Sequence, residues 1–271
     1  MTQHLQRPEG RLAFDDTGGS GPLVVCVPGM GDVRSEYRFL APQLVAGGFR
    51  VATLDLRGHG ESDAAFQDVG RPALGDDIIA LLSAPDAAPA HLIGCSFGAA
   101  GVVWAAAKAP ERVASVTLIG PFVRDAPTPW AQRLALRLML ARPWGARAWT
   151  AWFGKLHAGG RPADFDAHAS ALRASLADPR RLAALRGMAR ASAAEIDPLL
   201  DALPQPTTVV MGTADPDFPD PAAEANAIAR RTGGTVTLVE GAGHYPHVED
   251  PAATGRAVLA FIAGNGSSPT V

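Results

Sequence analysis

The sequence predicts an α/β fold in which a mostly parallel sheet carries helices on both faces. Short runs that are almost continuously apolar alternate along the chain with longer segments of helical periodicity. Strand runs of this composition are typical of a sheet that is covered on both sides, and regular alternation of strands and helices favours parallel pairing. The chain has 271 residues and is 47% hydrophobic, which is enough for one large core.

Apolar runs predict the strands in chain order: PLVVCVPG, FRVATLDLRG, AHLIGCS, VASVTLIGP, TTVVMGT and TVTLVEG. Helices are predicted between and after them: SEYRFLAPQLVAGG, ALGDDIIALLSA, FGAAGVVWAAAKAP, DPAAEANAIARR and EDPAATGRAVLAFIAG. Asp250 and Pro251 mark the start of the last helix, because an aspartate cap followed by proline is a common way for a helix to begin.

One long segment interrupts this alternation. From about residue 124 to residue 203 there is no strand pattern, and Ala, Leu, Arg and Trp recur at helical spacings. Four of the five tryptophans lie in this segment: Trp130, Trp144, Trp149 and Trp152. Because strands and helices resume after Pro206, we expect a helical insertion at residues 124–203 within one core formed by residues 1–123 and 204–271.

Composition and charge argue against several classes of protein. The net charge is −3, and Lys and Arg are scattered along the chain, so no basic surface for a nucleic acid is expected. The amino-terminal MTQHLQRPEG is polar, and no stretch reaches the roughly 18 apolar residues of a membrane span. We therefore expect a cytoplasmic protein with neither a nucleic-acid nor a membrane partner. Cys26 and Cys95 lie within apolar strand runs and are expected to be reduced packing residues.

The stretch HLIGCSFGAA places Ser96 between Gly94 and Gly98, at the expected junction of a strand and a helix. In the pattern G-x-S-x-G, the glycines permit a sharp turn that lifts the serine out of the packed sheet. The amide of the next residue, Phe97, then points toward an oxyanion at the helix amino terminus. A structural serine in a tight turn is the alternative, but the preceding strand and the following small-residue helix favour a nucleophile.

A serine nucleophile needs a base, and VEGAGHYPHVED supplies two candidates after a predicted strand. His244 follows a Gly-Ala-Gly turn, which is a loop position suited to catalysis. His247 lies three residues later and is the competitor. Two histidines this close also suggest a metal pair, but no third ligand stands at a suitable spacing. We therefore expect no metal.

The orienting acid is expected in MGTADPDFPD, the loop that follows the preceding strand. Asp215 is favoured because it lies nearest the strand end, where support is most rigid. Asp217 is the alternative, and Asp220 is expected to cap a helix. The order Ser96, Asp215, His244 is the order predicted for a nucleophile at a strand-turn-helix junction on such a sheet.

These motifs resemble the α/β-hydrolase superfamily over nearly the whole chain. Beyond GCSFG, the matching stretches are residues 27–63, GTADPDFP and GAGHYPHVEDP, and the D-x-R-G-x-G-x-S pattern within the first stretch is especially specific. The resemblance is to the branch of serine-nucleophile esterases and lactonases. It implies an eight-stranded sheet flanked by helices and a helical cap that matches residues 124–203. It also implies a catalytic triad of Ser96, Asp215 and His244.

The resemblance further implies an oxyanion hole. In this family the second donor is the residue after a His-Gly pair that follows the third strand. Here the pair is Pro28-Gly29, so the backbone amide of Met30 takes that place beside the amide of Phe97. A backbone donor does not depend on the side chain of its residue. The role that the histidine of the His-Gly pair has in relatives cannot be filled here, because proline takes its place. His59 in RGHGES is expected to be structural.

The resemblance and the serine together predict a hydrolase. Relatives with an aspartate nucleophile cleave carbon–halogen bonds or epoxides, and Ser96 disfavours both reactions. We expect hydrolysis of a carboxylic ester or lactone of a small, largely apolar substrate through an acyl-enzyme, without a cofactor. The alternatives are carbon–carbon bond hydrolysis, thioester hydrolysis, perhydrolysis, cyanohydrin lyase chemistry, or a ligand-binding receptor with low turnover. A nucleotide-binding dehydrogenase is disfavoured because PGMGDVR lacks the third glycine of G-x-G-x-x-G.

Apolar side chains of the insertion are candidates for a substrate pocket over the serine. They are Trp130, Met139, Trp149 and Trp152, with Phe122 at the edge of the core. Plain helix packing is the alternative for each of them. A small-molecule substrate is the expected partner, and the sequence is compatible with a monomer and with a homodimer. The substrate itself depends on cavity shape, which helical periodicity does not give.

Overall fold

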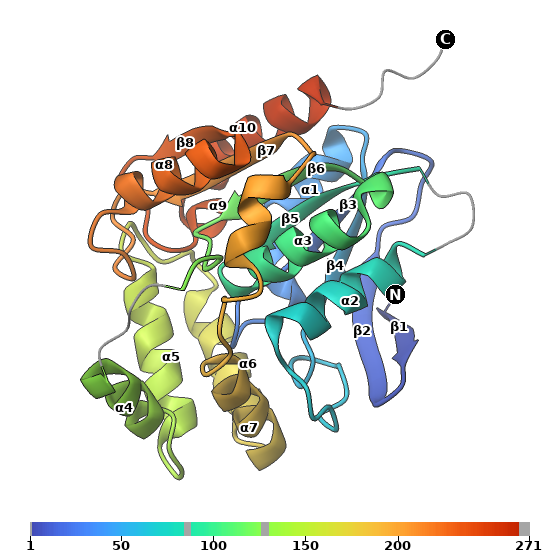
Figure 1. The fold of residues 1–271 in the computed structure, drawn as a ribbon. Coiled ribbons are helices and arrows are strands. Elements are labelled where there is room, and N and C mark those ends of the chain that lie inside the picture. The colour runs from blue at the N-terminus through green and yellow to red at the C-terminus, as the bar shows by residue number, and fades with distance from the viewer. Residues whose placement is uncertain (1, 84–87, 126–129, 266–271) are drawn as a thin grey trace.

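The computed structural model describes residues 2–83, 88–125 and 130–265. It contains an eight-stranded sheet in the order β1-β2-β4-β3-β5-β6-β7-β8 (Figure 1). The strands are β1 (Thr2–Arg7), β2 (Gly10–Asp16), β3 (Leu23–Val27), β4 (Arg50–Leu54), β5 (Ala90–Cys95), β6 (Val113–Ile119), β7 (Thr207–Gly212) and β8 (Thr235–Val239). All pairs are parallel except β1 with β2 and β2 with β4. The predicted eight-stranded, mostly parallel sheet is confirmed.

The predicted strands are β3 to β8, and the hairpin of β1 and β2 adds an edge that the apolar runs did not indicate. β1 reads TQHLQR, has Leu5 as its one apolar residue, and is exposed or half-buried throughout. It is held by antiparallel pairing with β2, from Thr2 with Asp15 to Arg7 with Gly10. Backbone hydrogen bonds rather than burial therefore hold this strand. Polar residues at a sheet edge also disfavour association with another edge.

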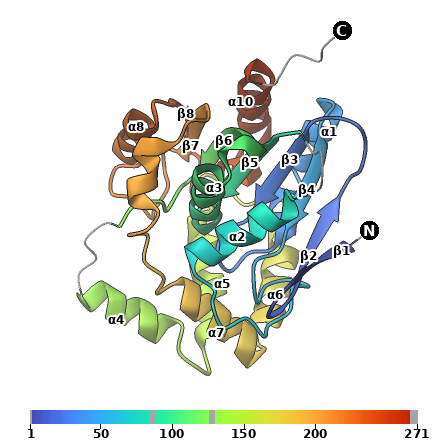
Figure 2. The same ribbon diagram turned by 45° about the vertical axis from the view of Figure 1, so that its right-hand side comes forward.

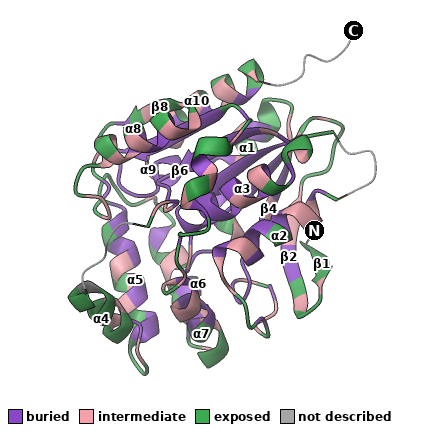
Figure 3. Ribbon diagram, in the orientation of Figure 1, coloured by how far each residue is buried: buried purple, intermediate pink, exposed green. Residues whose placement is uncertain are grey.

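Two sets of helices cover the two faces of the sheet (Figures 1 and 2). On one face lie α2 (Arg71–Leu81), α3 (Phe97–Lys108) and α8 (Pro221–Thr232), and on the other lie α1 (Ala41–Ala46) and α10 (Pro251–Gly264). Side chains of successive strand residues point to opposite faces of the sheet. Val25 packs with the apolar side chains of α2, α3 and α8, and Val24 packs with those of α1 and α10. Figure 3 shows the buried strands between helices whose outer faces are exposed.

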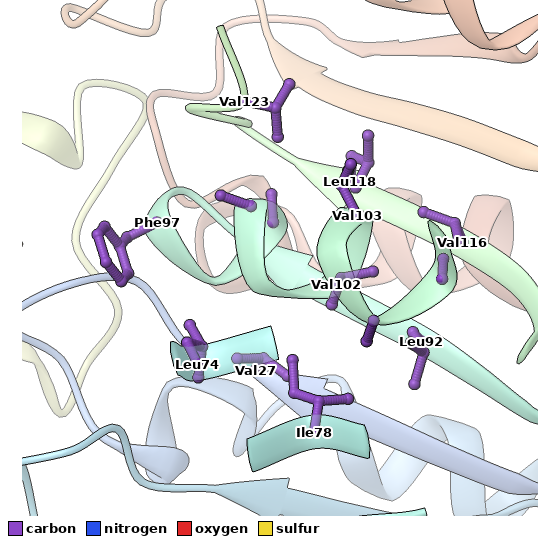
Figure 4. Close-up of a cluster of buried hydrophobic side chains, with 14 of the residues drawn as sticks. Val27, Leu74, Ile78, Leu92, Phe97, Val102, Val103, Val116, Leu118 and Val123 are labelled. Atoms are coloured by element: carbon purple, nitrogen blue, oxygen red, sulfur yellow. The ribbon is translucent and has the colours of Figure 1, made fainter. Parts of the chain in front are cut away.

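Apolar side chains pack closely around α3, the helix that follows the serine turn. Figure 4 shows Leu74 and Ile78 of α2 next to Val27 of β3 and Leu92 of β5, with the α3 side chains beside them. The remaining short elements are η1 (Arg34–Tyr37), η2 (Pro110–Arg112), η3 (Asp197–Ala202) and α9 (Pro246–Glu249). Two of these, η1 and α9, lie in the loops after β3 and β8.

In the described residues, the segment between β6 and β7 forms four α-helices before η3: α4 (Trp130–Met139), α5 (Gly145–Leu156), α6 (Phe165–Leu176) and α7 (Pro179–Met188). They lie together at one end of the sheet (Figures 1 and 2). Phe153 of α5 and Leu172 of α6 belong to the same apolar cluster as β3, β5 and α10. The insertion therefore packs continuously with the sheet. The division of the chain into a core and a cap stays a prediction.

No helix in the described part of the chain combines the length and the apolar character that crossing a bilayer requires. Cys26 and Cys95 are free and buried, on β3 and β5. Burial raises the pKa of both thiols, so they stay protonated and act as packing residues.

Polar contacts attach α6 to the region after β3. Arg38 donates to the two carboxylate oxygens of Asp164 at 2.6 and 2.9 Å, and His168 Nε2 lies 2.7 Å from Asp32 Oδ1. Burial lowers the pKa of His168, but the hydrogen bond and the charge of Asp32 outweigh burial, so the pKa lies above its ordinary value. The protonated form of His168 therefore favours the attachment of α6.

This pair should make the stability of the protein depend on pH. Because the folded-state pKa of His168 is raised, the contribution is fully present below the unfolded value of about 6.5 and is lost as the pH rises through the folded value. We expect the free energy of urea unfolding to fall more between about pH 6 and about pH 9 in the wild type than in His168→Asn. Equal losses in the two proteins would show that the pair does not contribute.

Candidate active site

Ser96 occupies the turn between β5 and α3. Its φ is 53° and its ψ is −117°, and it is the one non-glycine residue with a positive φ in the described ranges. Two glycines make the turn accessible: a Cβ on Gly94 would lie 2.7 Å from Ala99 N, and a Cβ on Gly98 would collide with Val27 O. The serine side chain consequently stands at the amino terminus of α3, as the motif predicted.

His244 and Asp215 form a buried pair. His244 Nδ1 lies 2.7 Å from Asp215 Oδ2, and the two side chains are 1% and 0% exposed. Asp215 follows β7 and His244 follows β8, and these parallel strands are neighbours, so their carboxyl-terminal loops meet. Gly212 allows the close approach, because a Cβ there would collide with Gly243 O.

Asp217 lies beside this pair at longer range. Its Oδ2 is 3.9 Å from His244 Nδ1, and its backbone N–H donates to Asp215 Oδ1 at 2.9 Å. The geometry therefore favours Asp215 over Asp217 as the group that orients the imidazole. Asp220 caps α8, where its Oδ1 accepts the Ala223 N–H at 2.9 Å.

Three carboxyl groups act on the pKa of His244. Burial lowers this pKa, whereas Asp215 raises it by its charge and its hydrogen bond, and the charges of Asp217 and Glu36 raise it further. The net effect is a raised pKa, so the imidazolium form is stabilised. Burial also raises the pKa of Asp217.

The segment after β6 lies between Ser96 and His244. Phe122 N–H donates to Ser96 O at 3.2 Å, and its ring centroid is 5.8 Å from that of the imidazole. Within the described ranges, no hydrogen bond joins Ser96 Oγ to His244, and Nδ1 is the ring nitrogen bound to Asp215. Nε2 is therefore the nitrogen free to exchange a proton with a substrate-side group. Hydrogen bonds of this kind are often made only when substrate binds.

The loop after β3 contains one amide without a protein acceptor. Three of its neighbours are satisfied: Gly29 N–H by Glu36 Oε2 at 2.8 Å, Gly31 N–H by His59 Nε2 at 3.1 Å, and Asp32 N–H by Gly29 O at 3.3 Å. Met30 N–H has no acceptor among the described residues. The loop borders the serine, because a Cβ on Gly29 would lie 3.2 Å from Ser96 Cβ.

Phe97 provides a second free amide. It is the first residue of α3, where backbone N–H groups have no acceptor within the helix. The positive end of the helix dipole adds to the attraction for an anion at this place. The amides of Met30 and Phe97 are thus suited to bind a negatively charged oxygen next to Ser96.

Two of the predicted pocket residues reach the site. Phe122 borders His244, and it also packs against Phe218, with ring centroids 4.9 Å apart. Trp149 of α5 reaches the loop after β3, where its Nε1 donates to Gly31 O at 3.3 Å. Phe218, which the sequence analysis did not identify, is part of the same aromatic wall.

The other predicted pocket residues have packing or exposed positions. Trp152 packs against the apolar cluster that the insertion shares with the sheet, and Trp152 and Met139 both pack against a smaller cluster within the insertion. Trp130 is 72% exposed on α4, which lies at the periphery of the fold (Figure 2). The inward face of this amphipathic helix carries Leu136 and Met139 instead, and for this reason Trp130 is not brought to the site.

Glu249 is a site residue that the sequence analysis missed. Its carboxyl group accepts the N–H groups of Gly243 at 2.9 Å and Tyr245 at 3.1 Å, which flank His244, and that of Gly159 in the insertion at 2.7 Å. This carboxyl group therefore fixes the backbone on both sides of the imidazole. The only signal in the sequence was an acid close behind the histidine in HYPHVED.

Two other histidines near the site have partners of their own. His59 Nδ1 donates to Arg57 O at 3.0 Å, and burial lowers the pKa of His59 to about 4, so it stays neutral and structural. His247 is buried, and its Nε2 lies 3.0 Å from Glu36 Oε1. Because only His244 is paired with Asp215, the geometry favours His244 over His247 as the base.

Two groups of potential metal ligands lie close together in the described part of the chain: Asp215 with Asp217 and His244, and Glu36 with Cys95 and His247. In the first group, the hydrogen bond to Asp215 occupies the ring nitrogen that faces the carboxylates. In the second, burial raises the pKa of the Cys95 thiol, which disfavours the thiolate that a metal binds. The expectation of a metal-free site stays a prediction.

Comparison with known proteins identifies a family to which the sequence matches and several similar proteins. The family model described as "Alpha/beta hydrolase family" matches residues 24–257. Pimeloyl-[acyl-carrier protein] methyl ester esterase of Methylococcus capsulatus is 31% identical over 265 residues, covering 93% of this chain and 99% of the relative. A match to the dihydrolipoyllysine-residue acetyltransferase component of the acetoin cleaving system of Pseudomonas putida is 43% identical but covers 41% of this chain and 30% of that relative. A thermophilic esterase from Thermogutta terrifontis superposes with a TM-score of 0.78 and 26% identity over 98% of this chain and all of the other.

The two aspartates should differ in their effect on His244. We expect Asp215→Asn to lower the pKa of His244 more than Asp217→Asn does, because Asp215 adds a hydrogen bond at 2.7 Å to its charge and Asp217 acts from 3.9 Å. Titration of the imidazole by NMR, with His244→Gln to assign the signal, measures both shifts. A larger shift in Asp217→Asn would reverse the assignment of the orienting acid.

Proposed function

The chain belongs to the alpha/beta hydrolase family and is a hydrolase, and from this premise we propose that it cleaves a carboxylic ester or lactone with Ser96 as the nucleophile. One observation carries the proposal. The buried hydrogen bond of 2.7 Å between His244 Nδ1 and Asp215 leaves Nε2 to act as a base near a serine held in a strained turn. The esterase names of the Methylococcus relative and the Thermogutta structure support the same reaction class.

In the first half of the proposed reaction, Ser96 becomes acylated. Ser96 Oγ attacks the carbonyl carbon while its proton passes to His244 Nε2, and Asp215 stabilises the resulting imidazolium. The amides of Met30 and Phe97 donate to the oxygen as it gains negative charge. Collapse of the tetrahedral intermediate breaks the bond to the leaving oxygen, which receives the proton from His244. In a lactone, the leaving hydroxyl stays attached to the acyl group.

In the second half, water releases the acid. His244 Nε2 takes a proton from a water molecule, and the hydroxide attacks the acyl carbon. The same two amides bind the oxyanion, and the bond to Ser96 Oγ then breaks while His244 returns the proton to that oxygen. No step requires a cofactor, since base, acid and oxyanion donors all come from the chain.

The surroundings of His244 support a substrate that is largely apolar. The rings of Phe122 and Phe218 lie beside the imidazole, and Trp149 borders the loop that carries Met30. Aromatic walls of this kind favour apolar acyl or alcohol groups by removing their surface from water.

Burst kinetics should reveal the acyl-enzyme. With short and medium-chain p-nitrophenyl esters we expect a rapid release of about one equivalent of nitrophenol per site and an acyl adduct on Ser96 by mass spectrometry. Ser96→Ala should lose the adduct and reduce kcat by at least about 10³-fold while keeping the same fold by circular dichroism. A folded wild type with neither burst nor adduct would overturn the proposal and favour lyase chemistry, carbon–carbon bond cleavage or a receptor.

The rate should follow the titration of His244. The imidazole must be neutral to act as a base, so kcat/KM is expected to rise with pH, with a midpoint above the ordinary value of about 6.5 because the pKa of His244 is raised. Removing the charge of Asp217 lowers that pKa, so Asp217→Asn should move the midpoint to lower pH. A midpoint that stays in place would show that Asp217 has no electrostatic effect on the base.

A further inference from the structure

The buried carboxyl group of Glu36 has no part in the proposed chemical steps. Glu36 lies on η1, after β3, and its side chain is 0% exposed. A buried carboxyl group is costly unless it is hydrogen-bonded. Its partners therefore indicate what holds it there.

Two hydrogen-bonding groups and a thiol converge on the carboxyl group of Glu36. Gly29 N–H donates to Oε2 at 2.8 Å, and His247 Nε2 lies 3.0 Å from Oε1. The Cys95 sulfur lies near this carboxyl group, since the ligand atoms of Glu36, Cys95 and His247 are all within 4.8 Å of one another. Groups from the loop after β3, the end of β5 and the start of α9 thereby surround one side chain.

Each of these three residues is a close neighbour in the chain of a proposed reacting group. Gly29 precedes Met30, whose amide is a proposed oxyanion donor. Cys95 precedes Ser96. His247 lies three residues after His244, at the start of α9. Glu36 thus connects the oxyanion loop, the serine turn and the base loop.

The Met30 amide is held from both sides. The peptide before Gly29 is fixed by the bond to Glu36, and the peptide after Met30 is fixed by the bond from Gly31 N–H to His59. Gly29 has no Cβ to restrict its rotation, and a Cβ there would be in tight contact with Ser96 Cβ at 3.2 Å. The hydrogen bond to Glu36 therefore restrains the backbone of Gly29, which has no side chain to restrain it.

The carboxyl group is itself held rigidly. Tyr37, the next residue, donates its hydroxyl to Val27 O at 2.8 Å and stacks on the His247 ring with centroids 5.1 Å apart. His247 Nδ1 is buried and has no partner, which favours the tautomer with the proton on Nε2, facing Glu36. Both ends of the Glu36–His247 contact are consequently fixed.

We propose that Glu36 is a positioning residue of the active site. Its carboxyl group sets the direction of the Met30 amide and keeps the serine turn and the base loop in register. This inference rests on the proposed serine hydrolase function.

Two substitutions of Glu36 test the effect of removing its acceptor oxygens while the size of the side chain is nearly kept. Glu36→Met keeps the length of the side chain and removes both oxygens, so Gly29 N–H loses its acceptor. Glu36→Gln keeps one acceptor oxygen, but its amide group must then face a second N–H, or His247 must move its proton to the unpartnered Nδ1. We therefore expect Glu36→Gln to be impaired less than Glu36→Met.

The test compares kcat, KM and the affinity for an aryl trifluoromethyl ketone. This probe adds to Ser96 Oγ and forms an oxyanion that needs the two amides, whereas KM for a p-nitrophenyl ester reports mainly on the ground state. We expect Glu36→Met to lower kcat about 10- to 100-fold and to change KM by less than about 3-fold. The affinity for the ketone should fall by the same factor as kcat.

Asp77 provides a matched control, because its side chain is also 0% exposed and is paired with Arg57 and Arg7 away from the site. Asp77→Asn should lower the midpoint of thermal unfolding and leave kcat and ketone affinity unchanged. If Glu36→Met unfolds, the same readouts are taken on Glu36→Gln, for which a loss of about 3- to 10-fold in kcat and in ketone affinity is expected. Folded Glu36 variants with unchanged kcat and ketone affinity, or with KM alone raised, would overturn the inference.

The experiment also distinguishes failure of this inference from failure of the proposed function. A wild type that forms no adduct dependent on Ser96 removes the serine mechanism, and the inference falls with it. A wild type that forms the adduct, together with Glu36 variants that match it in kcat, removes the role of Glu36 alone.

Discussion

The strained turn at Ser96 is the constraint to which the rest of the site is adapted. A serine with positive φ costs about 1–3 kcal/mol, and the turn persists because central strands hold it: Ser96 N–H donates to Ile119 O at 2.8 Å. Glycines at positions 94 and 98 let β3, β5 and α3 approach one another at backbone distance. Since the hydroxyl is fixed to the middle of the sheet, a base and oxyanion donors have to be brought to it by the loops around it.

Charge is distributed around the site in a way that matches the proposed reaction. Asp215 and Asp217 lie on the His244 side, where they favour a positive imidazolium, and free amides lie on the Ser96 side, where they favour a negative oxygen. Glu36 is a potential exception, because a carboxyl group near an oxyanion would oppose it. Its oxygens are directed at Gly29 N–H and His247 Nε2, which fits the proposal that it holds the amide in place.

The sequence predicts the parts of this structure that depend on local pattern. Apolar runs gave β3 to β8, and the glycines around Ser96 gave the turn, whereas the polar strand β1 was missed because backbone pairing rather than burial holds it. Position at a strand end favoured Asp215, as the 2.7 Å contact with His244 does. The contacts of Glu36 could not be predicted from local pattern, because its contact with His247 joins residues 211 positions apart. The outward direction of Trp130 could not be predicted either, because it depends on how α4 is rotated against α5.

The insertion contacts the backbone of the loops that carry the proposed base and the proposed oxyanion donor, through α5 and the residues after it. Leu156 O accepts the His244 N–H at 2.8 Å, and Trp149 Nε1 donates to Gly31 O at 3.3 Å, next to Met30. Gly159 N–H donates to Glu249, which also binds the two residues that flank His244. A shift of α5 would therefore move the proposed base and the proposed oxyanion donor together. The position of the insertion and the geometry of the proposed reacting groups are coupled through this one helix.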